Sequence, residues 1–384
     1  MIKRKNRWIA LALSAFILTS CGGPDSAKPS PQASGEEASS EEATKGEESQ
    51  EQPVAVSGDV QYYRPILDAD NHYQVSQNRG ITTKLNSRIN MSIFEEDLTR
   101  LSQDHFSVDD YYLQEGQFLT SKQVSSWLGR LSDDNPAGLN PQAGGDGESR
   151  EPAVLSSLIE YDFYKNTDDG MKMSGMSIGL AMNSVDYYPA YQYGPILSQN
   201  ISRDRLLKEG ERIANEVVKR VRKIEGLENI PIFIGLYEQS AQDDLAGGVY
   251  IQSGVSRNGE EGISSWQSIK EERMMFPLEG ETTAEGNAFA NFQSQVESFF
   301  PNISGLSARA HYINDQLVSM EIDVVPHFYS QAELVAFAQY LNRSANTYLP
   351  KNVRIEITIE SVSGVEAFLI RQKNAEGFAV HIFK

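Results

Sequence analysis

Hydrophobic positions divide the chain into three regions. A short apolar run covers residues 8–18, residues 24–53 hold no aromatic or large aliphatic side chain, and aromatic and aliphatic residues recur from residue 62 onward. Apolar positions that recur at spacings of three and four predict helices, and alternating apolar positions predict half-buried strands. The pattern therefore predicts a leader, a polar linker and a folded part.

Helix and strand signals alternate through the folded part. Three stretches have the pattern of a capping box, in which a Ser or Thr is followed three residues later by Glu or Gln. The predicted helices begin at the capping boxes Ser92–Glu95, Thr120–Gln123 and Ser330–Glu333, and a further helix covers 204–225. The predicted strands cover 178–182, 230–237, 310–313, 317–325, 353–360, 365–371 and 378–383.

The order strand, helix, strand occurs twice, in residues 151–265 and again in residues 285–384. This order predicts an α+β fold with two related α+β repeat units, which follow or include an N-terminal α/β segment over residues 60–150. Two origins fit the pattern: an internal duplication, or the chance recurrence of a common motif.

The leader has the layout of an export signal. A basic cluster at residues 3–7 precedes the apolar run Trp8–Leu18, which is too short to span roughly 30 Å of hydrocarbon as a stable anchor. We therefore predict a signal peptide over residues 1–20.

The end of the leader, Leu18-Thr19-Ser20-Cys21, resembles the lipobox of bacterial lipoproteins. Leu18 suits an apolar pocket of the signal peptidase, small Thr19 and Ser20 admit the backbone to its active site, and the thiol of Cys21 receives diacylglycerol. Cys21 is the only cysteine in the sequence, so no internal disulfide can form. We expect a lipid-anchored protein on the extracytoplasmic face of the membrane. The alternatives are a transmembrane anchor and an ordinary cleaved signal.

Residues 21–59 are rich in Ser, Glu, Ala, Gln, Pro and Gly, and they predict a disordered acidic tether. The whole chain has a formal net charge of −19. A surface this acidic repels phosphate backbones, which excludes nucleic-acid binding.

No catalytic pattern occurs in the sequence. The five histidines lack zinc-motif spacing, and there is no nucleophile elbow, P-loop or dinucleotide-binding glycine motif. Residues 68–72 resemble the start of a calcium loop, but Tyr73 and Arg79 stand where an EF-hand needs Gly and Glu. An Asx-rich turn is the preferred interpretation, and an irregular calcium site is the alternative. We predict no metal and no cofactor apart from the lipid on Cys21.

Polar and aromatic side chains follow the strand predicted at 178–182. Asn183, Asp186, Tyr187 and Tyr188 are candidate ligand-binding residues, because such clusters at strand ends bind peptides and sugars. The alternative is that they only close a loop over the core.

Several long strings resemble the CamS sex-pheromone lipoproteins of Gram-positive bacteria. These strings are Tyr63–Asp70, Gln74–Gly80, Phe106–Tyr112, Gly179–Tyr188 and Ile213–Arg220. The resemblance covers nearly all of residues 62–384 and implies repeated α+β units, which favours the duplication.

The resemblance also implies a second role for the leader. In this family the end of the signal peptide is trimmed and released as a short hydrophobic peptide, which neighbouring cells sense and which induces conjugative plasmid transfer. The candidate pheromone consists of Ser14, Ala15, Phe16, Ile17, Leu18, Thr19 and Ser20. The implied partners are the membrane, the lipoprotein processing enzymes and a pheromone receptor.

For the mature part the sequence favours a non-catalytic binding or scaffolding module. One alternative is a cell-envelope enzyme acting on glycan or peptide, which would need two carboxylates facing each other across a cleft. The other is a purely structural lipoprotein without a deep pocket.

Overall fold

The computed structural model describes residues 62–383, apart from residues 69, 83, 84, 146, 279–282, 301, 302, 328 and 329. The predicted signal peptide, the lipobox with Cys21, the candidate pheromone and the acidic tether all lie outside the described residues. No helix among the described residues is both long enough and apolar enough to cross a membrane.

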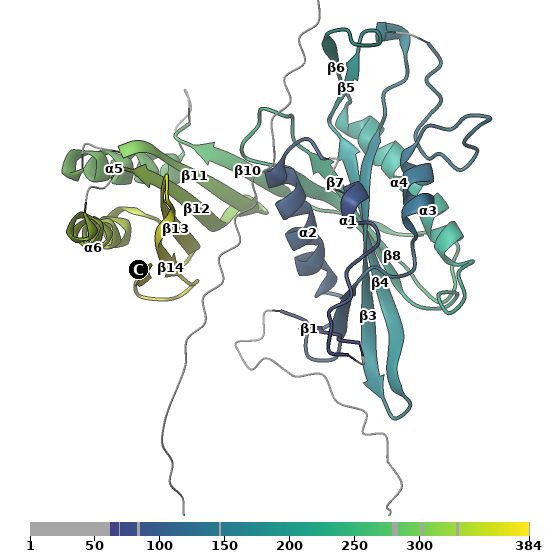
Figure 1. Cartoon of the computed structure of the whole chain (residues 1–384), viewed down its shortest axis with the longest axis horizontal. Coiled ribbons are helices and arrows are strands. Elements are labelled where there is room, and N and C mark those ends of the chain that lie inside the picture. Colours follow the sequence, from purple (N-terminus) through teal and green to yellow (C-terminus); the bar gives the residue numbers. More distant parts are fainter. Residues whose placement is uncertain are drawn as a thin grey trace, which may run out of the picture. The chain divides into compact units, whose positions relative to one another are not determined.

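The first sheet has seven strands, and its centre is built from two hairpins joined through a helix. Strands β4 and β7 pair in parallel, α4 (Arg203–Val221) connects them, and β3 and β8 pair antiparallel on the two outer sides (Figure 1). In spatial order the strands are β1 (Arg64–Pro65), β2 (Tyr112–Glu115), β3 (Leu155–Thr167), β4 (Gly170–Asn183), β7 (Ile232–Gln239), β8 (Val249–Ser256) and β9 (Trp266–Ser268).

Helices cover both faces of this sheet. Because successive side chains of a strand point to opposite faces, β7 supplies two separate cores: Ile232, Ile234 and Leu236 pack with α4 and α3 (Ser121–Leu128), whereas Phe233 and Tyr237 pack with α2 (Arg88–Ser102). Because both faces of β7 are buried, its sequence is a continuous apolar run.

The close approach of α2 depends on glycine in the sheet beneath it. A Cβ at Gly235 would lie 2.6 Å from the ring of Tyr250, and one at Gly179 would lie 2.8 Å from the ring of Phe94. Either contact is too short, so only glycine lets these two rings pack against the sheet.

The second sheet has six strands and carries its own helices on one face. Helices α5 (Ala284–Phe299) and α6 (Gln331–Tyr348) lie side by side on it (Figure 1) and share its apolar core. In spatial order the strands are β10 (Glu271–Phe276), β11 (Ile303–Ile313), β12 (Gln316–Pro326), β13 (Arg354–Ser361), β14 (Gly364–Arg371) and β15 (Ala379–Ile382).

Both sheets contain the same arrangement of five elements. In the first, hairpin β3–β4 is joined by α4 to hairpin β7–β8; in the second, hairpin β11–β12 is joined by α6 to hairpin β13–β14. The two strands joined by the helix are parallel in each case. The α+β class is confirmed, and the origin of the two units by duplication stays a prediction.

The remaining elements connect these layers, and one predicted helix start is wrong. They are α1 (Arg79–Thr82), the separate hairpin β5 (Val185–Pro189) and β6 (Ile196–Asn200), and a 3₁₀ turn at Gly147–Ser149. Thr120 and Ser330 cap α3 and α6 as predicted. Helix α2, however, is capped by Ser87, so Ser92 lies inside it, because the apolar stripe begins one turn earlier.

Candidate functional site

A pocket of about 280 Å³ lies between α2, the end of β2, the middle of β3 and the chain that enters α1. Four charged side chains line it together with amide, hydroxyl and apolar groups. The lining residues are Ser76, Asn78, Arg79, Met91, Glu95, Glu115, Ile159, Glu160 and Tyr161. None of them was a predicted site residue.

Glu115 is held by several donors. The guanidinium of Arg79 binds both carboxylate oxygens, with Nε donating at 2.8 Å, while the Ser76 amide donates at 2.9 Å and the Tyr73 hydroxyl at 3.2 Å. Burial alone would raise the pKa of Glu115, but the hydrogen bonds from Arg79 and Ser76 outweigh it and hold the pKa below its usual value. Glu115 is therefore ionised, and Arg79 neutralises it.

Glu160 belongs to a buried carboxyl pair with Asp162, two residues along β3. Glu160 accepts from the amides of Phe118 and Leu119 at 3.0 Å each, and Asp162 accepts from the amide of Gln117 at 2.8 Å. Burial raises the pKa of both carboxyls, and the charge of Glu160 raises that of Asp162 further. We conclude that Glu160 fixes the loop that leads into α3 and that burial favours the protonated form of Asp162.

Glu95 differs from both. Within the described part of the chain, no hydrogen bond or ion pair engages its carboxylate, although the side chain is exposed to solvent and lines the pocket. Partial burial raises the pKa of Glu95, the negative charge of Glu115 raises it further, and Arg79 acts in the opposite direction. The pocket thus combines one unengaged carboxylate with the apolar groups of Met91, Ile159 and Tyr161.

The structure brings three of the four predicted strand-end residues together around residues 150–153. Asn183 donates to the Ala153 carbonyl at 2.8 Å, Asp186 accepts from the Ala153 amide at 2.9 Å and pairs with Arg150, and that guanidinium lies 4.0 Å from the ring centre of Tyr188.

Tyr187 lies apart from these three, and its hydroxyl accepts from the amide of Gln242 at 3.2 Å. These contacts are those of a closed loop, which was the alternative interpretation. Ligand binding by the four residues stays a prediction.

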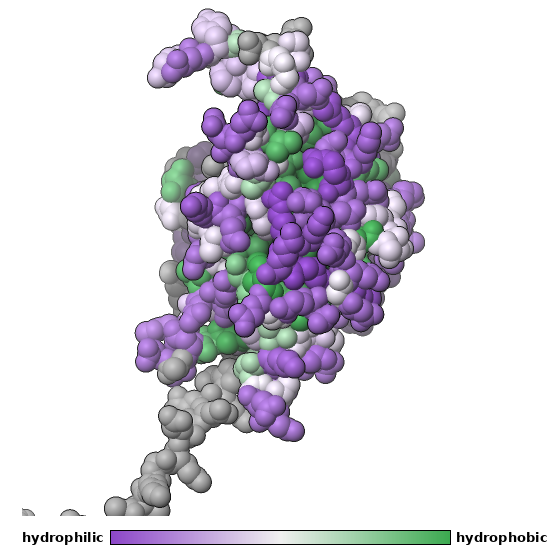
Figure 2. Space-filling view, turned by 90° about the vertical axis from the view of Figure 1, so that its right-hand side faces the viewer, coloured by the Kyte–Doolittle hydropathy of each residue, from purple (hydrophilic) through white to green (hydrophobic). Residues whose placement is uncertain are grey.

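Hairpin β5–β6 extends beyond this cluster. Tyr191, Tyr193 and Ile196 at its tip are exposed, and a hollow of about 460 Å³ lies beside β6. The face of the molecule drawn in Figure 2 is mainly polar, with small separate apolar areas between the polar side chains.

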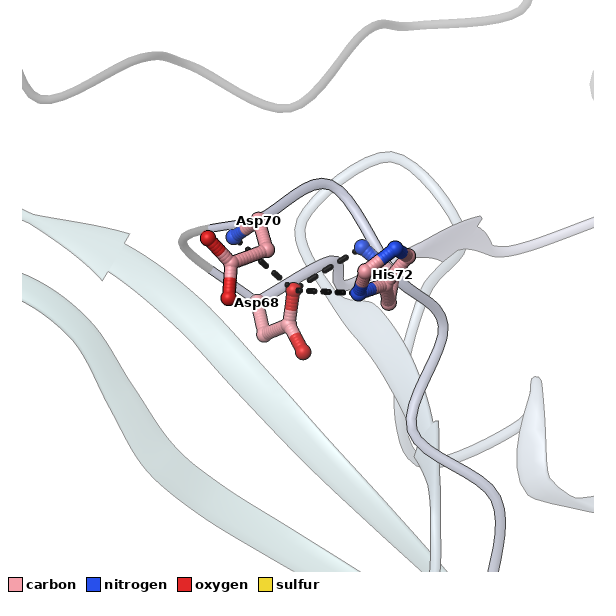
Figure 3. A group of neighbouring side chains, drawn as sticks. All are labelled: Asp68, Asp70 and His72. Carbon is pink, nitrogen blue, oxygen red and sulfur yellow. Dashed lines mark hydrogen bonds and ion pairs between the residues drawn. The ribbon is translucent and has the colours of Figure 1, made fainter.

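Asp68 forms the predicted Asx turn with the backbone amides of Asp70 and His72 (Figure 3). Oδ1 of Asp68 accepts from the amides of Asp70 and His72 at 3.0 and 2.8 Å, and Nδ1 of His72 lies 4.0 Å from the same oxygen. These amide hydrogen bonds fix the position of the Asp68 carboxylate, and the absence of a metal ion at this loop stays a prediction.

A second group of possible metal ligands, Asp97, Glu271 and His311, is buried. Two guanidiniums already neutralise its two carboxylates: Arg100 lies 2.9 Å from Asp97 and 2.8 Å from Glu271, and Arg273 lies 2.7 Å from Asp97. Nε2 of His311 completes the group at 3.0 Å from Glu271. The two guanidiniums supply the positive charge that a metal ion would otherwise bring. The group is therefore an ion-pair network that links α2 to β10 and β11.

Comparison with known proteins identifies the family. The family model described as CamS sex pheromone cAM373 precursor matches residues 73–377. This chain belongs to the CamS family.

Two solved structures of sex pheromone precursors resemble the fold. A sex pheromone precursor from Lactobacillus salivarius is 32% identical, with a TM-score of 0.82 over 86% of this chain and 98% of that one. The C-terminal domain of the sex pheromone staph-cAM373 precursor from Staphylococcus aureus is 26% identical, with a TM-score of 0.67 over 79% of this chain and 99% of that one. No curated protein matches the sequence. The family match includes every residue that lines the pocket.

Proposed function

We propose that this CamS-family chain is a lipid-anchored precursor with two roles. Its leader supplies a signalling peptide, and its folded part is a non-catalytic module that binds a small ligand in the pocket beside Glu95. The lipobox Leu18–Cys21 carries the first role, and the pocket with its unengaged carboxylate carries the second.

The first role rests on the leader and on the names of the relatives. Both similar structures are described as sex pheromone precursors. The segment Ser14–Ser20 has no charged side chain, so the released peptide would partition into membranes and suit an apolar receptor site. Durable anchoring through Cys21 requires at least two acyl chains. A coil of the length of residues 21–59 spans roughly 35 Å.

The leader role is tested in a strain that expresses the full chain. Mass spectrometry of the medium should detect the peptide Ser14–Ser20, and the peptide should raise plasmid transfer. Cys21→Ala should abolish lipid labelling and release of the peptide, whereas Ser26→Ala should change neither. Absence of the peptide from the medium of the unmodified strain would contradict this role.

The second role rests on the unequal state of the carboxylates in the pocket. Glu115 is occupied by Arg79 and Ser76, and Glu160 by two backbone amides, so Glu95 alone can receive a ligand. Hydrolysis by a carboxyl pair needs both groups to face the reacting bond. In every possible pair among Glu95, Glu115 and Glu160, at least one carboxylate is bound by other groups of the protein.

An envelope enzyme acting on glycan or peptide is the second candidate. One observation favours it: Glu95 and Glu115 share a pocket while their pKa values move in opposite directions, as in an acid–base pair. Incubation of the mature chain with cell-wall glycan and peptide, followed by mass spectrometry, separates the candidates. Binding predicts no product, and products that disappear in both Glu95→Gln and Glu115→Gln would establish the enzyme.

Binding itself is tested with crystals of the mature chain soaked in a mixed set of neutral, anionic and cationic fragments. The proposed module predicts electron density for at least one fragment between Glu95 and Tyr161. Fragments found only elsewhere, or none at all, would contradict the proposed binding role.

A further inference from the structure

We infer that the pocket recognises a primary ammonium group, which Glu95 holds while the carbon skeleton of the ligand lies against Met91, Ile159 and Tyr161. This inference rests on the proposed binding function and names the chemical class of its ligand. It concerns a small amine with no anionic group beside its nitrogen.

The charges in the pocket favour a cation. Three of the lining residues are glutamates and one is an arginine. Arg79 balances Glu115, which leaves the negative charges of Glu160 and Glu95 uncompensated among the lining side chains. A ligand carboxylate or phosphate placed there would meet net repulsion, and the guanidinium of Arg79 is already bound to Glu115 through two of its nitrogens.

The available oxygen atoms favour an organic cation over a metal ion. Calcium takes six to eight oxygen ligands, and magnesium needs near-octahedral geometry. Glu115 accepts from Arg79, Ser76 and Tyr73, and both oxygens of Glu160 accept from backbone amides. Glu95 is left as the one carboxylate with both oxygens open to a ligand, which is enough for an ammonium group but not for a metal shell.

The walls and the size of the pocket describe the rest of the ligand. Met91 lies one helical turn before Glu95 on α2, and Ile159 and Tyr161 face the same space from β3, so apolar surface flanks the carboxylate. A volume of about 280 Å³ is at the lower limit for small-molecule sites. An amino sugar or a short alkylamine matches both the size and the mixed lining.

The protonation of Glu95 is consistent with this assignment. Partial burial and the charge of Glu115 raise the pKa of Glu95 in the free protein, and a bound ammonium would lower it by favouring the ionised form. Binding should therefore release protons near that pKa and weaken as the pH falls through it.

The test measures binding to the mature chain by NMR with two matched pairs of probes: glucosamine with N-acetylglucosamine, and n-hexylamine with 1-hexanol. Each pair differs chiefly in the ammonium group. We expect both amines to bind at the pocket at least about tenfold more tightly than their neutral partners. Equal binding within the pairs, or equal binding of methylguanidine, would overturn the inference.

Two isosteric variants locate the interaction. Glu95→Gln should weaken amine binding at least about tenfold. Glu96→Gln removes the same charge from the next position of α2, which lines a different hollow with Arg88 and Arg309, and should leave binding unchanged. Undiminished amine binding by Glu95→Gln would contradict the assignment.

The outcomes also separate this inference from the function on which it rests. If neutral or anionic probes occupy the pocket and amines do not, the binding function stands and the ammonium assignment fails. If no probe of any charge occupies the pocket, both fail.

Discussion

The two units that share the β–β–α–β–β order differ in what covers the sheet face opposite their own connecting helix. In the first sheet that face packs against Phe94 and Leu98 of α2, which are fully buried. In the second sheet the corresponding face of β10 and β11 carries Arg273 and His311, which belong to the ion-pair network with Asp97 of α2.

Helix α2 thus uses two kinds of interaction on its two sides. Apolar packing is nondirectional and does not depend on pH. The ion-pair network requires each partner to be present and correctly placed, because a lone buried charge is costly. We expect the apolar side to supply stability and the polar side to make the contact with the second sheet selective. The exposed Glu95 on the same helix lines the pocket instead.

The largest effect is expected on the apolar side. Phe94 is completely buried, and its ring centre lies 5.1 Å from that of Tyr237 and 6.0 Å from that of Tyr250. Phe94→Ala should lower the free energy of unfolding by about 3–5 kcal/mol, measured by urea unfolding. A loss below about 1 kcal/mol would show that α2 is not part of the core.

On the polar side we expect a loss of unfolding free energy near the lower end of the range given for Phe94→Ala. Arg273→Met leaves the buried carboxylate of Asp97 with Arg100 alone and should cost about 3 kcal/mol at neutral pH. A cost near zero would mean that the network does not contribute to the contact.

The polar side should also depend on pH, whereas the apolar side should not. Burial alone would raise the pKa of Asp97, but Arg100 and Arg273 hold it below its usual value. This contribution is present above the unfolded pKa of about 3.9 and is lost as the pH falls through the lower folded value. In acid titrations the penalty of Asp97→Asn should therefore shrink, and that of Phe94→Ala should not.

The buried pair on β3 predicts a smaller effect with the opposite pH dependence. The folded pKa of Asp162 is raised by burial and by Glu160, so its contribution is present at low pH and is lost as the pH rises through that value. Asp162→Asn should lie within about 1 kcal/mol of wild type below the unfolded pKa of about 3.9 and should become the more stable of the two as the pH rises above that value. A difference in unfolding free energy between wild type and Asp162→Asn that stays the same at all pH values would contradict this prediction.

The smallest effect concerns the pocket. The folded pKa of Glu95 is raised, so its ionised form at neutral pH is unfavourable for folding. Glu95→Gln should therefore raise the melting temperature slightly while it weakens amine binding, and Glu96→Gln should do neither. A clear drop in melting temperature would make Glu95 a structural residue.

The sequence predicted the elements whose burial follows a simple period. The continuous apolar run of β7, the alternation of β13 and the caps at Thr120 and Ser330 all identified their elements. Strand β3 was missed because Glu160 and Asp162 interrupt its apolar pattern, and both are buried only because amides of a distant loop bind them.

The pocket could not be predicted from the sequence for a similar reason. Arg79 and Glu115 are 36 positions apart, and no motif connects them. The sequence pattern indicated only a capping-box role for Glu95, whereas the structure shows that Ser87 caps the helix. The proposed role of Glu95 depends on its carboxylate having no hydrogen-bond or ion-pair partner among the described residues. No local sequence pattern indicates this.

The most direct measurement is the pKa of Glu95, followed by NMR in the mature chain with and without n-hexylamine. We predict a value above the usual pKa of about 4.3 in the free protein and a fall when the amine is added. An ordinary value that does not change with the amine would contradict the proposed site.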